Sequence, residues 1–462
     1  MCMTKFFEDK AFYKNLLAIV LPIVIQNAVT SFVSLLDNIM VGQIGTKAMS
    51  AVSICNQLNN VYMFLMFGAF SAVGIFACQF KGKDDEEGIL NCFRLKLYVC
   101  LIMILVLTLT ILLFGENIFN IFFQNKNNSP ELAITMIDLS LSYFRFLLPG
   151  LFFFTFSTCM AFTLRELGNT FTSMMSSVIA IFINLILNYV LIFGHFGFPA
   201  LGVEGAAIAT SIARFVECII LVIFIFKNTE YNYLTTVFKK FSIPLVLCLD
   251  ILKRGGPLFI NEIFYSFGEA GLAQCYSVMG VDPLASMNIN LTVANFFSVA
   301  CFAMGTATSI VLGQLLGKGE LDKAKPTAIR LLKANVFIAI VFGIILFILA
   351  PYFPRIYNTS LENQELACKL LWVYALHLPL LGIYHTSYFI IRSGGKTMIT
   401  FWFDGFYTAF ILFGTAFLIT TFTNFDMLML YICVNLVDII KTVVGFTLVK
   451  SGFWVQNIVK DY

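Results

Sequence analysis

Twelve stretches of mostly apolar residues run along the chain, each long enough to cross the hydrocarbon core of a bilayer as a helix, which takes about 20 residues. They lie at residues 16–40, 48–78, 92–114, 131–161, 171–194, 205–227, 252–279, 284–313, 329–350, 366–391, 398–421 and 427–449. Because 59% of the 462 residues are hydrophobic and only 12% are charged, a water-soluble chain would lack the polar residues to cover its surface. The sequence therefore predicts an all-α integral membrane protein with twelve transmembrane helices.

Basic residues are distributed unevenly between the loops on the two sides of these spans. If the N-terminus is cytoplasmic, the inner segments with the adjoining ends of the spans hold 22 of the 29 Lys and Arg residues, and the outer loops with theirs hold four. Cytoplasmic loops of membrane proteins collect basic residues. We therefore expect a multi-pass protein of the cell (plasma or inner) membrane with both termini cytoplasmic. The net charge of +3 indicates no nucleic-acid partner.

The chain also repeats itself at an offset of 235 residues. Sliding the sequence on itself by this offset pairs Pro22 with Pro257, Gly45 with Gly280, Gln79 with Gln314, Gly82 with Gly317 and Lys83 with Lys318. Thirteen of the 62 positions compared are identical, whereas composition alone would give roughly five. Each half holds six spans, and because six is even, both halves enter the membrane from the same side as parallel repeats.

These repeats predict two six-helix lobes related by a pseudo-two-fold axis along the membrane normal. We expect an N-terminal lobe at residues 1–227, a cytoplasmic linker between the lobes at 228–250 and a C-terminal lobe at 251–462. Two such lobes enclose a central cleft, and rocking one against the other exposes the cleft to alternate sides of the membrane. A carrier that works by alternating access exploits this duplication, whereas a channel or receptor does not require it.

Several motifs resemble those of the multidrug and toxic compound extrusion (MATE) family of the MOP flippase superfamily. They are DNIMVGQIG, RELGNT, NLILNYVLIFG and GVEGAAIATSIAR in the first half, and NEIFYSFGEAG and RSGGKT in the second. The resemblance extends over essentially the full chain. It implies a secondary active antiporter that expels organic, often cationic, compounds in exchange for H+ or Na+.

Asp37 is an acidic residue within the first predicted span. A carboxylate at the centre of a spanning helix costs roughly 2.5–3.5 kcal/mol, whereas each Leu, Ile, Phe or Val returns about 0.3–0.6 kcal/mol, so the helix still inserts. The alternatives are a functional acid and a hydrogen-bonded contact between helices with no transport role. The resemblance implies that Asp37, Asn184, Asn188 and Thr210 form the oxygen-rich ion site of the N-terminal lobe.

Two coupling ions are compatible with these residues. Carboxylate, amide and hydroxyl oxygens suit a hard cation such as Na+, but several members of the family have a second carboxylate where this chain has Asn188. Burial disfavours the charged form of a lone carboxyl. We therefore expect protonation of Asp37 to be the coupling step, ahead of sodium binding, and we expect no cofactor other than the coupling ion.

The second half has no counterpart of Asp37, because the offset of 235 pairs that residue with Leu272. Two acids, Glu262 and Glu269, instead lie seven residues apart on one face of the seventh predicted span. We hypothesise that they line the cleft and bind a cationic substrate, together with the neighbouring residues Asn261, Tyr265 and Ser266. The alternative for each acid is a buried ion pair.

Other charged residues in the spans have simpler interpretations. Arg214 with Glu217, and Asp438 with Lys441, are each three residues apart on a helix, so each is interpreted as a self-compensating pair. Asp404 has no assigned partner. The sequence shows no nucleophile elbow, phosphate-binding loop or metal-ligand spacing, so we expect that the protein is not an enzyme.

The partners expected are small organic, cationic substrates and the lipid bilayer, with the chain functional as a monomer. Two other functions stay open. One is a flippase for lipid-linked oligosaccharides or other lipids, within the same superfamily. The other is a structural or sensory membrane protein without transport activity, which would leave the acids of both halves unexplained.

Overall fold

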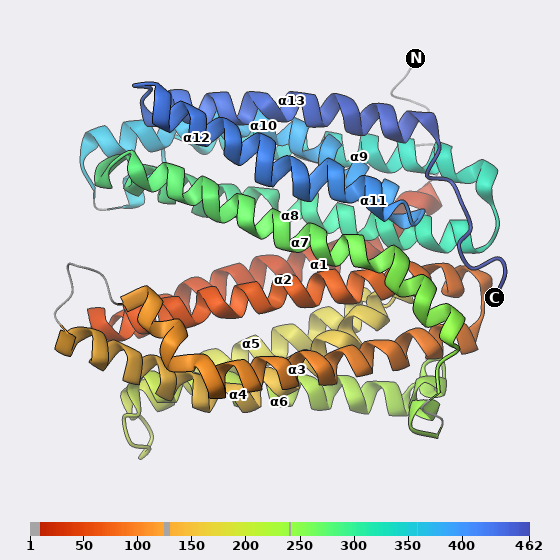
Figure 1. Cartoon of the computed structure of the whole chain (residues 1–462), viewed down its shortest axis with the longest axis horizontal. Coiled ribbons are helices and arrows are strands. Elements are labelled where there is room, and N and C mark those ends of the chain that lie inside the picture. The colour runs from red at the N-terminus through yellow and green to blue at the C-terminus, as the bar shows by residue number, and fades with distance from the viewer. Residues whose placement is uncertain (1–9, 124–129, 240–241, 358) are drawn as a thin grey trace. The chain divides into compact units, whose positions relative to one another are not determined.

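The computed structural model describes residues 10–123, 130–239, 242–357 and 359–462, and within these ranges the chain is helical, with no strand (Figure 1). The first half contains α1 (Lys10–Gly42), α2 (Thr46–Lys83), α3 (Glu86–Phe123), α4 (Pro130–Glu166), α5 (Thr170–Phe193) and α6 (Gly202–Lys227). A short 3-10 helix, η2 (Asn232–Lys239), lies in the predicted linker. The predicted all-α class is confirmed.

The second half begins with α7 (Leu245–Val278), α8 (Val281–Gly317) and α9 (Leu321–Leu349), followed by the 3-10 helix η3 (Phe353–Ile356) and α10 (Leu361–Ser393). The next span is continuous but has three parts: α11 (Thr397–Thr400), the π-helix η4 (Phe401–Leu412) and α12 (Phe413–Phe422). The last helix is α13 (Met427–Ser451).

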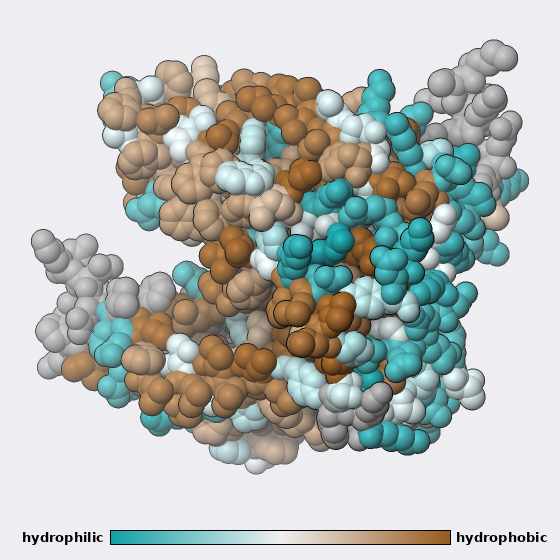
Figure 2. Space-filling model, turned by 45° about the vertical axis from the view of Figure 1, so that its right-hand side comes forward, coloured by the Kyte–Doolittle hydropathy of each residue, from teal (hydrophilic) through white to brown (hydrophobic). Residues whose placement is uncertain are grey.

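Eleven helical segments of the described chain are long and apolar enough to cross a membrane. The predicted span missing from these eleven is the seventh, which corresponds to α7. This helix is 34 residues long but contains Asp250, Lys253, Arg254, Glu262 and Glu269. Figure 2 shows hydrophobic surface over the middle of the helices in each bundle and hydrophilic residues toward the ends. Apolar side chains such as Leu112 and Ile348, both more than 60% exposed, form part of this surface. Extensive apolar surface of this kind is what a lipid-facing protein presents.

The described chain divides into two compact units. Unit N consists of Ile25–Phe70 and Leu90–Pro244, and unit C consists of Leu245–Tyr462 together with Ser71–Ile89 and the segment that ends at Val24. Along the chain, the change from unit N to unit C at Pro244 lies within the linker predicted at 228–250. The predicted lobe boundaries stay a prediction. They differ from the two units in that α1 up to Val24 and α2 from Ser71 belong to unit C.

The first part of α1 belongs to unit C because its apolar residues are buried there. Leu16, Val20 and Ile23 are each at most 5% exposed, in a core cluster that includes residues of α8, α9, α10 and the C-terminal tail. Beyond Val24 the helix belongs to unit N. The change of unit comes two residues after Pro22, where the missing backbone N–H weakens the helix and allows it to bend.

Within unit C, α2 and α8 approach each other so closely that only glycine fits at the contact. A Cβ atom on Gly82 would overlap the backbone carbonyl of Gln314, and one on Gly317 would overlap the backbone carbonyl of Gln79. The offset of 235 residues pairs Gly82 with Gly317 and Gln79 with Gln314, so each contact corresponds to the other with the two helices interchanged. The sequence repeat therefore has a structural counterpart here, since a two-fold relation pairs residue i with j and j with i.

The C-terminal tail packs onto this α2–α8 contact. The Gln79 side chain donates a hydrogen bond to the Ser393 carbonyl (3.0 Å) and accepts one from the Ile458 backbone N–H (2.8 Å). The Asn457 side chain donates to the Gly317 carbonyl (3.2 Å). Trp454 in the same tail is fully buried. The tail thus satisfies backbone and side-chain polar groups at the ends of the helices.

We predict that Gly317→Ala lowers the thermal stability of the detergent-solubilised protein, because the new Cβ forces α2 and α8 apart at a cost of about 1–3 kcal/mol. Gly414→Ala on α12 is the matched control, since a Cβ there meets no atom within 4 Å. The control is expected to match or exceed the wild-type melting temperature. Equal melting temperatures for Gly317→Ala and the wild type would contradict the close contact.

Candidate ion and substrate sites

Asp37, Asn184, Asn188 and Thr210 come together in unit N. Asp37 is half-buried on α1, Asn184 and Asn188 are 8% and 2% exposed on α5, and Thr210 lies on α6. The Asn188 amide donates a hydrogen bond to Asp37 Oδ1 (2.7 Å). The four residues that the family resemblance implied are therefore one hydrogen-bonded group, which we call the Asp37 site.

The amide of Asn184 fits the site in either orientation, and the reverse one satisfies both of its polar ends beside an ionised Asp37. In the first, its Oδ1 accepts from Asn188 Nδ2 (3.3 Å) and its Nδ2 donates to Thr210 Oγ1 (3.2 Å). In the reverse orientation, its Nδ2 donates to Asp37 Oδ2 (3.2 Å) and its Oδ1 accepts from the backbone N–H and the hydroxyl of Thr210 (both 3.2 Å). The reverse orientation gives an ionised Asp37 one N–H donor on each oxygen.

The first orientation has a different chemical requirement. The Asn184 carbonyl oxygen then occupies the position next to Asp37 Oδ2 that the amide nitrogen takes in the reverse orientation. Two oxygen acceptors this close need a proton or a cation between them. Asn188 Oδ1 is also buried without a hydrogen-bond partner among the described residues. The oxygens available thus fit either a protonated carboxyl or a hard cation.

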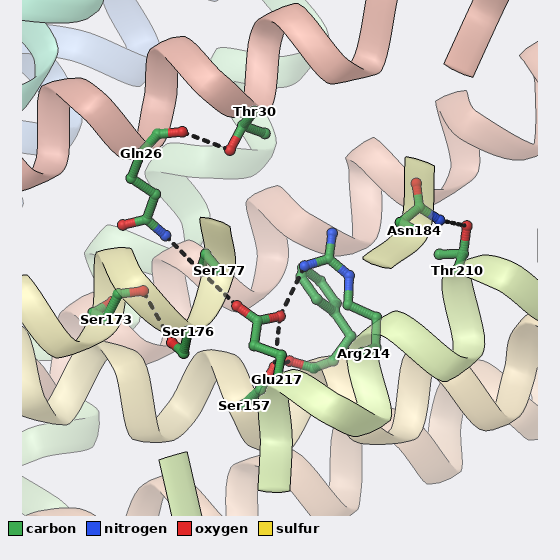
Figure 3. A network of polar contacts seen from close by, with 11 residues as sticks. Gln26, Thr30, Ser157, Ser173, Ser176, Ser177, Asn184, Thr210, Arg214 and Glu217 are labelled. Atoms are coloured by element: carbon green, nitrogen blue, oxygen red, sulfur yellow. Dashed lines mark hydrogen bonds and ion pairs between the residues drawn. The ribbon is translucent and has the colours of Figure 1, made fainter. Parts of the chain in front are cut away.

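A second polar network lies in the same unit and is shown in Figure 3. Glu217 of α6 accepts hydrogen bonds from Ser177 Oγ (2.5 Å), Ser157 Oγ (3.4 Å) and Arg214 Nη1 (2.9 Å). Gln26 of α1 donates to Ser177 Oγ (2.8 Å). The predicted Arg214–Glu217 pair is present, but the sequence analysis missed that the network extends to α1, α4 and α5.

The predicted substrate residues lie in unit C, where Asn261 and Glu262 of α7 are fully or almost fully buried. The Asn261 Nδ2 atom lies 3.4 Å from Glu262 Oε1 and 3.3 Å from Asp404 Oδ2. The Tyr388 hydroxyl donates to Glu262 Oε1 (3.4 Å). Asn261 Oδ1 accepts from the Gly405 backbone N–H (2.8 Å), which fixes α7 against η4.

The other three residues predicted to bind substrate have different environments. Glu269 is exposed at the surface of unit C, although it lies two turns from the buried Glu262 on the same helix. Tyr265 is half-buried between them. Ser266 is half-buried and donates to the backbone carbonyl of Glu262 (2.8 Å). The structure thus groups Asn261 with Glu262 but separates Glu269 from their hydrogen bonds.

The interpretation of Asp438 and Lys441 as a self-compensating pair is wrong. The Lys441 ammonium donates to Asp404 Oδ1 (2.7 Å), and Asp438 Oδ2 lies 3.0 Å from His377 Nε2. Each charge therefore pairs with a residue on another helix. A spacing of three residues allows a contact within one helix, but partners on η4 and α10 satisfy these charges instead.

The MatE family model matches residues 22–190 and 257–420, more than half of the chain. The chain belongs to the MATE family of membrane transporters. A probable multidrug resistance protein NorM of Thermotoga maritima is 24% identical to this MATE protein over 387 residues, covering 83% of this chain and 81% of the relative. A probable NorM of Oceanobacillus iheyensis is 25% identical over 420 residues, covering 89% and 92%.

Solved structures of MATE transporters share the fold. A crystal structure of MATE in complex with MaL6 has a TM-score of 0.84 at 20% sequence identity, covering 95% of each chain. An outward-facing structure of a multidrug resistance MATE transporter of the MOP superfamily has a TM-score of 0.82 at 20% identity, again covering 95% of each chain. This likeness confirms the predicted fold of twelve helices in two lobes.

We predict that Arg214→Met destabilises the protein by about 1–3 kcal/mol, because it removes the cation from the nearly buried Glu217, although Arg214 itself is partly exposed. Adding Glu217→Gln should recover part of the loss, since no uncompensated charge then remains. Thermal unfolding in detergent measures both effects. The exposed Lys323–Glu320 pair provides the control, and Lys323→Met should leave the melting temperature unchanged. Additive losses in the double variant would contradict the pairing.

Proposed function

We propose that this MATE transporter expels small organic cations from the cell by alternating access, in exchange for protons. The relatives named as multidrug resistance proteins support the efflux of drugs. We also propose that the chain works as a monomer in the cell membrane with both termini cytoplasmic. The distribution of Lys and Arg between the predicted loops supports this orientation.

The proton is proposed as coupling ion because one polar end of the Asn184 amide lies 3.2 Å from Asp37 Oδ2. With the Asn184 carbonyl oxygen toward Asp37 Oδ2, a proton on the carboxyl supplies the hydrogen bond between the two oxygens. After the proton leaves, rotation of the amide turns its N–H group toward the ionised carboxylate. Both protonation states of Asp37 therefore have a satisfied partner without any movement of the backbone.

Helix α1 is the element through which this change would act on transport. Asp37 lies in the part of α1 that belongs to unit N, whereas the part before Val24 belongs to unit C. Pro22 lies beside the change of unit. A proton that enters from outside neutralises Asp37, changes the bend of α1 near Pro22 and disfavours the bound substrate. Gln26 and Thr30 lie between these two points, and the Thr30 hydroxyl donates to the Gln26 carbonyl (2.8 Å).

Substrate binding is assigned to the acidic residues of α7. Glu262 and Asn261 form the buried part of this group, and Glu269, Tyr265 and Ser266 the more accessible part. Carboxylates beside aromatic rings attract organic cations by charge and by cation–π contacts. Acidic residues at a substrate site repel the phosphate groups of a lipid-linked cargo, so they favour efflux of cations over lipid flipping.

We predict that purified protein in liposomes transports a fluorescent organic cation when a pH gradient is imposed without sodium. Asp37→Asn should lose at least about 90% of this transport, since it removes the titrating group. Glu320→Gln, a change in a partly exposed acid of the α8–α9 turn, is the control and should transport like the wild type. Strict dependence of wild-type transport on sodium would contradict proton coupling and favour Na+ as the coupling ion.

We predict that Glu269→Gln weakens efflux of monovalent organic cations several-fold, mainly through a higher KM, because one attractive charge is lost at an accessible position. Accumulation of fluorescent cations in cells that express each variant measures the effect. A neutral substrate of similar size serves as the control and should be unaffected. Unchanged efflux of every cation tested would remove Glu269 from the substrate site.

A further inference from the structure

Lys441 is a nearly buried cation on α13, the last helix of unit C. Its side chain is 5% exposed, and its ammonium donates a hydrogen bond to Asp404 Oδ1 at 2.7 Å. Asp404 lies in the π-helix η4, and its second oxygen lies 3.3 Å from Asn261 Nδ2. The ammonium is therefore held by a carboxylate that is itself positioned by α7.

Three aromatic rings surround the same ammonium. The Lys441 Nζ atom lies 4.9 Å from the ring centroid of Tyr384, 5.5 Å from that of Tyr407 and 5.7 Å from that of Phe403. The Tyr407 hydroxyl donates to the Val437 carbonyl (2.7 Å), which fixes the orientation of its ring. All three distances fall within the range of cation–π attraction. We call Asp404 and the three rings the ammonium cage.

The cage is assembled by an unusual local structure. Phe403, Asp404 and Tyr407 all belong to η4, whose π-helical winding differs from that of the α-helices on either side. Such segments are rare and occur frequently at functional sites. The Asn261 side chain holds η4 in place by accepting from the Gly405 N–H (2.8 Å). A buried ion pair alone needs only one carboxylate, whereas this arrangement adds three rings around the cation.

One carboxylate together with several aromatic rings is the chemical arrangement that recognises organic ammonium groups. We propose that the ammonium cage is a binding site for the ammonium group of a small organic cation, and that Lys441 is its tethered occupant, which such a ligand replaces. The inference rests on the proposed efflux of organic cations. It adds a second binding site for such a cation, beside the acidic residues of α7. Asn261 connects the cage to Glu262, since its Nδ2 atom lies within 3.4 Å of both carboxylates.

The tethered cation has a physical role when no ligand is bound. Without Lys441, the carboxylate of Asp404 would be an uncompensated charge within the membrane. When a ligand takes the cage, the flexible four-carbon stem of Lys441 allows its ammonium to turn toward another acid. Charge balance is then kept with the ligand bound.

Butylammonium tests the cage directly, because it reproduces the four carbons and the charge of the lysine side chain. The experiment compares the wild type with Lys441→Ala as purified full-length chains in detergent, without any ion gradient. Butylammonium should raise the melting temperature of Lys441→Ala, with a half-maximal concentration about tenfold or more below that for the wild type. Butanol and NaCl are the matched controls and should give no such difference.

Two further variants identify the cage as the place of binding. Lys441→Ala combined with Asp404→Asn should lose the response to butylammonium, because the carboxylate is gone. Lys441→Ala combined with Tyr384→Leu should need a several-fold higher concentration, because one ring is gone. A response that is equal in all three variants would overturn the proposal, as would a lack of response in Lys441→Ala.

The test stays decisive if Lys441→Ala is not recovered as folded protein. Extraction in the presence of butylammonium should then restore its yield, whereas butanol should not. If yield returns only when Asp404→Asn is added, Lys441 is a structural partner and the proposal is wrong. Because binding is measured without transport, failure here leaves the proton-coupled efflux proposed for Asp37 intact, and failure of that coupling leaves binding in the cage intact.

Discussion

The absence of water in the bilayer core is the constraint on which this structure depends, because every polar side chain on a spanning helix must find its partner within the protein. The chain satisfies several of its buried acids with separate polar networks inside each unit. Asp37 is paired with amides of α5, and Glu217 is paired with an arginine and two serines. Asp404 is paired with a lysine and an amide. Each network brings together helices that are distant in sequence, so the polar groups specify which helices pack together.

Small residues contribute the second element of this packing. Where α2 meets α8, Gly82 and Gly317 let each helix touch the other's backbone, and the two contacts are related by the internal repeat. Glycine is required because any side chain would separate the helices. In α7, Gly268 similarly lies against the backbone of Thr408 in η4, which holds the π-helix beside Asn261. Close backbone contacts thus position the helices, and the polar networks fix which faces meet.

The sequence was sufficient for those features that depend on local pattern. The length of the apolar stretches predicts the spans, and matching residues 235 apart predict the repeat, since neither depends on tertiary contacts. The grouping of Asp37 with Asn188 came from the family resemblance, and the hydrogen bond between them agrees with it. The pairing of Lys441 with Asp404 was missed. Spacing along one helix shows only which residues are able to meet, whereas the choice of partner depends on helices that the sequence does not place.

Two other features are not specified by the sequence pattern alone. The π-helical winding of η4 arises where that segment packs against α7, and its apolar residues look like those of an ordinary span. The change of unit within α1 is marked only by Pro22, which equally well indicates a simple kink. Both features depend on contacts with other helices.

The central claim is that a proton on Asp37 and a bound organic cation exclude each other. Proton release measures this most directly: a fluorescent organic cation is added to purified protein in weakly buffered detergent solution, and the protons released are counted with a pH indicator. The account predicts that the wild type releases up to about one proton per cation bound and that Asp37→Asn, which still binds the cation, releases none. Equal release by both proteins, or cation binding to the wild type without release at any pH, would contradict it.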